Sequence, residues 1–184
     1  MKNSSNQTAM KWGSISALVG IIFWFGLYFT DLYMNNSVNW TIYLVVLSCQ
    51  VLGIKEFRDK MNGGFVKFGT AFGISFKIAL LSGIVSSLMG YVMSKWIDTG
   101  MTEAIKQKAM NDMIAKGMSD EMIDKAMNMT SFFFKPEFIL IVGIIMGALI
   151  FGSIFSLIIS AIMKKDDTFL NIDSNESSDS FKLN

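Results

Sequence analysis

Four predominantly apolar stretches recur along the chain, at residues 12–32, 38–54, 74–95 and 137–163. An α-helix rises about 1.5 Å per residue, so roughly 20 apolar residues are needed to cross a hydrocarbon core about 30 Å thick. The second stretch is short and fits only if its helix stands upright in the bilayer. The pattern therefore predicts an all-α integral membrane protein whose four spans form a helix bundle within residues 12–163.

Basic residues indicate how these spans are oriented. The connection between the first two spans holds no Lys or Arg, whereas the next connection carries Lys55, Arg58, Lys60 and Lys67. Cytoplasmic loops of membrane proteins carry the excess of Lys and Arg. Because lysines also precede the first span and follow the fourth, we expect the N-terminal segment 1–11 and the tail 164–184 to be cytoplasmic. The third connection is then external, although it also carries lysines.

This third connection, residues 98–135, has helical patterning of its own. Apolar residues recur near helical spacing on both sides of Gly117, which can end a helix, and Ser119 can cap the helix that follows. We therefore expect an external amphipathic helical hairpin between spans three and four. The tail 164–184 is polar and acidic beyond Lys165, and this composition predicts disorder.

Composition excludes several classes of function. Hydrophobic residues make up 52% of the 184 residues, and the net charge of +1 gives no basic excess for nucleic acid. The chain has no histidine and a single cysteine, Cys49, so Ser-His and Cys-His catalytic pairs cannot form and the usual zinc ligand sets are missing. We expect no catalytic residues, no cofactor and no metal site, and hence no enzyme.

Small residues spaced four apart mark possible helix-packing faces on spans three and four. Such residues let two helix backbones approach closely in lipid. Packing of the two spans within one chain is favoured over a homo-oligomer face. The candidate packing residues are Gly69, Gly73, Ala79, Gly83, Ser87 and Gly90 in or before span three, and Gly143, Gly147, Gly152 and Ser156 in span four.

Two polar residues are candidates for an intramembrane role. Lys77 lies in the third apolar stretch, where a charge is costly unless it has a partner or a pathway to serve. Its place near the predicted inner boundary favours a side chain that extends to the lipid headgroups. Gln50, next to Ser48 and Cys49, could form a polar spot inside the bundle, and Asp31 could pair with Lys95 at the outer rim.

The predicted hairpin is rich in methionine, which suggests a copper(I) hypothesis because thioethers are soft ligands. The same methionines follow the apolar pattern, and methionine is also an adaptable packing residue, so we favour packing. The residues concerned are Met110, Met113, Met118, Met122, Met127 and Met129.

One connection carries a family resemblance. The stretch Lys55-Glu56-Phe57-Arg58-Asp59, then Gly63-Gly64-Phe65-Val66-Lys67-Phe68-Gly69 and the glycine-bearing third span, resembles the bacterial domain-of-unknown-function family four-one-nine-nine, over roughly residues 10–165. The resemblance implies a small four-span protein of the bacterial inner membrane, with no known activity and no functional residues to carry over. Gly63-Gly64 itself predicts a turn with positive φ before span three.

These patterns favour a non-enzymatic multi-pass membrane protein that supports or binds a partner in the envelope, through its small-residue faces or the hairpin. The lipid bilayer is the one partner that the hydrophobic pattern itself implies. A small transporter or channel is the alternative, with Lys77 and Gln50 as pore-lining candidates.

Overall fold

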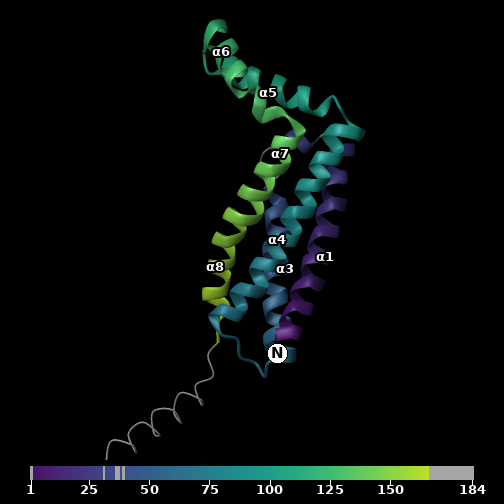
Figure 1. Cartoon of the computed structure of the whole chain (residues 1–184), viewed down its shortest axis with the longest axis vertical. Helices are drawn as coiled ribbons and strands as arrows, with labels where there is room; N and C mark the ends of the chain where they lie inside the picture. The colour runs from purple at the N-terminus through teal and green to yellow at the C-terminus, as the bar shows by residue number, and fades with distance from the viewer. Residues whose placement is uncertain (1, 31, 36–37, 39, 166–184) are drawn as a thin grey trace, which may run out of the picture.

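The computed structural model describes residues 2–30, 32–35, 38 and 40–165, and these residues fold as helices joined by turns and short connections (Figure 1). An isolated antiparallel bridge joins Val66 to Lys165. Asp31 and most of the tail predicted to be disordered, residues 166–184, lie outside the described residues. The α-helices are α1 (Lys2–Phe29), α3 (Thr41–Glu56), α4 (Phe68–Val92), α5 (Met101–Ala115), α6 (Asp120–Thr130), α7 (Pro136–Val142) and α8 (Gly152–Met163).

Several α-helices continue through wider π-helical turns or short 3-10 turns. The π-helical segment η5 (Gly143–Phe151) joins α7 to α8 in one unbroken helical run. Two further π-helical segments follow α3 and α4, and 3-10 turns follow α1 and α6. These shorter segments are η1 (Leu32–Met34), η2 (Phe57–Met61), η3 (Met93–Ile97) and η4 (Ser131–Phe134).

Three helical runs are long and apolar enough to cross a membrane, namely Ser4–Phe29, Phe68–Ile97 and Pro136–Met163. They correspond to the first, third and fourth spans predicted above. The second predicted span, 38–54, corresponds to α3, whose 16 residues are fewer than a full crossing usually needs. In Figure 1, α3 runs alongside the long helices, and it packs against α1, α4 and α8.

Two predicted helix starts differ from the structure by six residues or more. The first helix starts at Lys2 rather than at residue 12, because Thr8 and Ala9 are buried against the bundle and so extend the helix beyond its apolar stretch. The third helix starts at Phe68 rather than at residue 74. The fourth run, Pro136–Met163, agrees with the predicted span to within one residue.

The best-packed part of the bundle lies at the end that carries the N-terminus. Ile54, Phe57, Ile74 and Ile78 are fully buried there and form one apolar cluster with Val66. The turn leading into α4 has positive φ at Gly63 and Gly64, which confirms the predicted glycine turn. This packing fixes the relative positions of α1, α3, α4 and α8 at one end of the molecule.

The predicted helical hairpin is present as α5 and α6, which extend beyond the opposite end of the bundle (Figure 1). Gly117 has a φ of 76°, as expected of a helix stop, and Ser119 stands at the N-cap of α6 without a side-chain capping bond. Apolar side chains gather on one face of α6. In α5 they do not, since Met101 and Met110 are nine residues apart and lie on opposite sides. The amphipathic prediction is therefore wrong for α5.

Candidate functional site

Helix α4 packs closely on the run from α7 to α8 through small residues. A Cβ atom added at Gly83 would lie 2.6 Å from the Cβ of Ala148, and one added at Gly143 would lie 2.7 Å from the Oγ of Ser87. One added at Gly152 would lie 3.1 Å from the Cβ of Ala79. The face formed by Ala79, Gly83 and Ser87 therefore meets Gly143, Ala148 and Gly152, and Ser156 is fully buried further along α8.

Along the run from α7 to α8, the spacing of the residues that contact α4 differs from the predicted spacing. Gly143 and Ala148 are five residues apart, although the sequence pattern suggests Gly147 as the next contact after Gly143. The π-helical segment η5 accommodates an extra residue per turn, and this brings Ala148 to face α4 in place of Gly147. A Cβ added at Gly147 would meet no atom within 4 Å.

Not every candidate packing glycine takes part in a close contact. Added Cβ atoms at Gly69, Gly73 and Gly90 would likewise meet no atom within 4 Å. Instead, Gly90 and Gly147 line a large cavity between the helices, whereas Gly69 and Gly73 line a smaller one. Their missing side chains therefore leave open space rather than permit helix contact.

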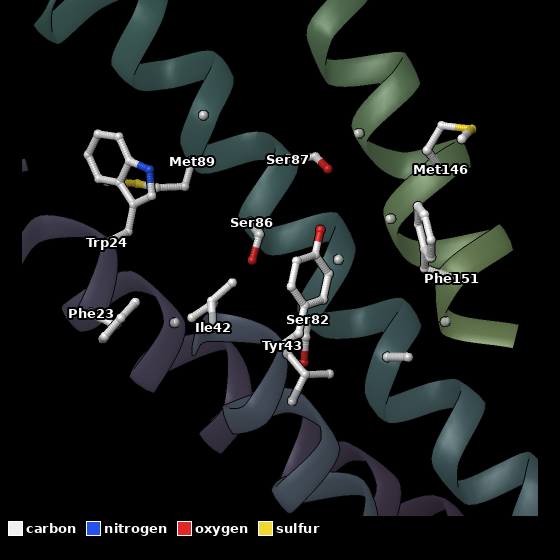
Figure 2. Close-up of a pocket in the computed structure, with 18 of the residues that line it drawn as sticks. Phe23, Trp24, Ile42, Tyr43, Ser82, Ser86, Ser87, Met89, Met146 and Phe151 are labelled. Carbon is white, nitrogen blue, oxygen red and sulfur yellow. The ribbon is translucent and has the colours of Figure 1, made fainter. Parts of the chain in front are cut away.

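The large cavity has a volume of about 430 Å³ and lies between α1, α3, α4 and the run from α7 to α8 (Figure 2). Its walls are mainly aromatic and aliphatic, including Trp24, Tyr43 and Phe151. Polar groups come from Gln50 and from three serines of α4, Ser82, Ser86 and Ser87. Among the described residues that line it, none is Lys, Arg, Asp or Glu.

Gln50 is the most deeply buried polar residue of this cavity. It is only 1% exposed, and its side-chain oxygen Oε1 has no hydrogen-bond partner among the described residues. The hydroxyl of Ser82, by contrast, donates to the carbonyl oxygen of Ile78 at 2.8 Å. Since a buried carbonyl oxygen without a donor is costly, the unpaired Oε1 of Gln50 lowers the stability of the bundle locally, and its lack of accessible surface keeps it out of reach of the cavity.

Lys77, the other candidate polar residue, does not lie in this cavity. Its ammonium donates to Oδ1 of Asn6 in the first turns of α1. It lines the smaller cavity together with Ser5, Thr70 and Ile74, near the end of the bundle that carries the N-terminus. The structure therefore places Lys77 and Gln50 in separate cavities.

An ionic contact near that end of the bundle has no counterpart in the sequence predictions. The carboxylate of Glu56 accepts from Nζ of Lys11 at 2.8 Å and from Nε1 of Trp12 at 2.5 Å. These two hydrogen bonds lower the pKa of Glu56. The contact ties α1 to the end of α3. A basic residue beside Trp12 at the start of the apolar stretch is the only sequence signal for it.

The outer end of the bundle has polar contacts of its own. Lys95 donates to Glu137 at 2.6 Å and to the hydroxyl of Tyr91 at 2.7 Å, and the hydroxyl of Tyr28 donates to Asp98. Asp31, the carboxylate suggested as the partner of Lys95, lies outside the described residues. Lys95 therefore links the run that follows α4 to the start of α7.

The hairpin methionines differ in their exposure. Met122 and Met129 are more than half exposed, whereas Met110, Met113, Met118 and Met127 are half-buried. The backbone N–H of Met118 donates to the carbonyl of Met113 across the hairpin turn, which brings these two residues together. Copper(I) binding by this group stays a prediction.

The fold thus defines an all-helical protein with three helical runs able to span a membrane and an uncharged cavity between its helices. Residues 11–165 match the family DUF4199, described as a protein of unknown function, and the chain belongs to this family. This confirms the resemblance inferred from the connection between α3 and α4. No curated protein and no solved structure matches the chain.

Proposed function

We propose that the chain is a non-enzymatic protein of the bacterial inner membrane that crosses the bilayer four times, with both termini in the cytoplasm. Supporting this orientation, basic residues gather near the end of the bundle that carries the N-terminus: Lys11 contacts Glu56, and Lys165 pairs with Val66. The third connection would then stand outside the membrane as the α5–α6 hairpin. Helix α3, beside the long helices, would be a short upright crossing.

We propose further that the hairpin binds a partner protein in the envelope. The observation that carries this role is the exposure of large apolar side chains on the hairpin: Ile114 is 56% exposed, Met122 53% and Met129 73%. In Figure 1 the hairpin extends away from the bundle, and none of the residues of α5 is buried. Exposed apolar groups of this kind are typical of protein interaction sites.

Site-specific photocrosslinking in intact cells tests this role. A photoreactive residue at Met122 or Met129 is expected to capture one protein of defined mass, because both side chains face outward. Lys116 and Asp124, exposed polar positions on the same hairpin, serve as matched controls and are expected to give weaker capture. The adduct should disappear when Ile114→Lys is added, since a charge there disrupts an apolar contact. Capture of lipid alone, or of a second copy of the chain, would contradict a partner protein.

Transport is the second candidate, and the cavity among the helices is the observation in its favour. The described residues that line this cavity include no charged side chain, and Lys77 lines the other cavity. The large cavity is therefore better suited to a neutral solute than to an ion. Solute flux into liposomes that contain the purified chain alone would support transport over the accessory role. Flux unaffected by Gln50→Leu would argue against passage through this cavity.

A further inference from the structure

We propose that the smaller cavity binds the phosphate group of an anionic phospholipid, held by the ammonium groups of Lys67 and Lys77. The cavity has a volume of about 380 Å³ and lies near the end of the bundle that carries the N-terminus. The inference rests on the proposed insertion of the chain in a membrane, with this end at the cytoplasmic face. It does not depend on the hairpin or its partner, because the described residues that line the cavity all lie outside α5 and α6.

The charge of the lining selects an anion. Lys67 and Lys77 both line the cavity, and no Asp or Glu stands among its described lining residues. Neither lysine forms an ion pair within the part of the chain that the structure describes. The ammonium of Lys77 donates to Oδ1 of Asn6, but this amide is neutral and leaves the charge uncompensated. Two like charges in one cavity repel each other, and a bound anion attracts both.

The segment before α4 holds two acidic residues, and both already have basic partners. Glu56 pairs with Lys11 at 2.8 Å, and Asp59 pairs with Arg58 at 2.7 Å. These carboxylates are therefore engaged elsewhere, and the two lysines of the cavity remain able to hold a ligand.

Neutral groups and open space complete the lining. The hydroxyl of Thr70 and the amide of Asn62 line the cavity with the lysines. Cβ atoms added at Gly69 and Gly73 would meet no atom within 4 Å, so a head group can approach the backbone of α4 there. Since no side chain caps the start of α4, its first N–H groups also favour a negative charge at this place.

A column of phenylalanines beside the cavity selects a lipid over a free phosphate. Phe68 stacks on Phe72, and Phe72 stacks on Phe76, along one side of α4. At about 100° per residue, Gly73 lies between this column and the side of the helix that carries Lys77. Because apolar rings adjoin the cationic cavity, an amphiphile can place its phosphate on the lysines and its acyl chain against the rings.

The position along the helix fits the boundary of a bilayer. The run Phe68–Ile97 has 30 residues and is about 45 Å long, whereas the hydrocarbon core is about 30 Å thick. Its first turns therefore extend into the head-group layer, where Lys67 precedes them. The flexible stem of Lys77 lets its ammonium reach the same layer. Basic pockets between membrane helices on the cytoplasmic side suit the head groups of anionic lipids.

The test counts lipids bound to the full chain by native mass spectrometry in a neutral detergent. Phosphatidylglycerol and phosphatidylcholine with the same acyl chains are supplied in equal amounts. The parent chain is expected to retain one phosphatidylglycerol with about tenfold preference, because only this lipid has a net negative head group. Lys67→Gln and Lys77→Gln should each weaken its binding about fivefold. Lys164→Gln, at an exposed lysine outside the cavity lining, is the matched control and should change it by less than about twofold.

Two further arms test the space and the source of the phosphate. Gly73→Leu fills the cavity without a change in charge and should abolish the preference, while the fold is retained because the added side chain enters open space. Inorganic phosphate at the concentration of the lipid should not displace phosphatidylglycerol, because it has no acyl chain to place against the phenylalanines.

Three results would overturn the proposal. Equal retention of the two lipids would show that the cavity does not select an anion, and an equal loss in Lys164→Gln and Lys77→Gln would show that any basic residue serves. Displacement by inorganic phosphate would assign the cavity to a free anion. Reconstitution of the same chains into liposomes tests insertion separately, so a chain that inserts but shows no lipid preference contradicts this site alone.

Discussion

Gly83 of α4 lies directly against Ala148 of η5, and a Cβ atom at Gly83 would come within 2.9 Å of the Cα of Ala148 as well as 2.6 Å of its Cβ. The two helices are therefore nearly in backbone contact at this point. Gly143 with Ser87 and Gly152 with Ala79 repeat the contact on either side. The small-residue face thus holds α4 to the run from α7 to α8, next to the cavity lined by the same helices.

The first prediction compares two glycine substitutions. Gly83→Ala should lower the stability of the bundle by about 1–3 kcal/mol, because the added methyl group overlaps Ala148 and α4 must move. Gly147→Ala, in open space one residue from Ala148, should leave stability unchanged or raise it by about 0.5–1 kcal/mol. Thermal unfolding of the two variants in detergent measures both effects. Equal destabilisation would show that Gly147 also packs against a helix.

The second prediction concerns Glu56 and pH. Its pKa is lowered by the hydrogen bonds from Lys11 and Trp12, so the folded chain binds fewer protons at this group than the unfolded chain. The stability that Glu56 contributes is therefore present above the ordinary Glu pKa, about 4.3, and is lost as the pH falls through the lower folded value. Glu56→Gln should reduce stability at neutral pH by about 1–2 kcal/mol and flatten this acid dependence.

The matched control for Glu56 is Asp59→Asn. Asp59 forms an ion pair with its chain neighbour Arg58, at 2.7 Å, and this contact does not join two helices. Its loss should change the unfolding temperature less than Glu56→Gln does. A larger effect of Asp59→Asn at neutral pH would show that the contact of α1 with α3 through Glu56 contributes little.

The third prediction separates the two polar residues. Lys77→Met removes the hydrogen bond to Asn6 but leaves the large cavity untouched, because Lys77 lines a different cavity. Any solute flux through the large cavity should therefore be the same in Lys77→Met as in the parent chain. A change as large as that caused by Gln50→Leu would mean that the two cavities are coupled.

Much of this fold could be predicted from hydropathy and glycine placement, but some features could not. The long apolar runs, the hairpin helices and the positive φ at Gly63 and Gly64 all follow from local sequence. The start of α1 at Lys2 does not, since its polar residues become helical through burial of Thr8 and Ala9. Hydropathy marks the end of an apolar stretch, whereas tertiary contacts decide where the helix ends.

The candidate site was harder to predict than the fold. Gln50 and the small residues could be named from sequence, but Gly147 and Ala148 could not be assigned to opposite roles. That assignment depends on the π-helical segment η5, whose residues are uniformly small or apolar and carry no signal for the wider turn. The contact of Glu56 with Lys11 joins residues 45 positions apart, and such pairing follows from how the helices pack.

The central claim is that α3 completes a fourth crossing, so that the chain passes through the membrane an even number of times before its tail. Cysteine labelling with a membrane-impermeant maleimide tests it most directly, in a Cys49→Ala chain that carries one new cysteine at Asn35, Lys60 or Lys116. Our account predicts labelling of Asn35→Cys and Lys116→Cys from outside intact spheroplasts, and of Lys60→Cys only after lysis. Labelling of Asn35→Cys and Lys60→Cys from the same side would contradict it.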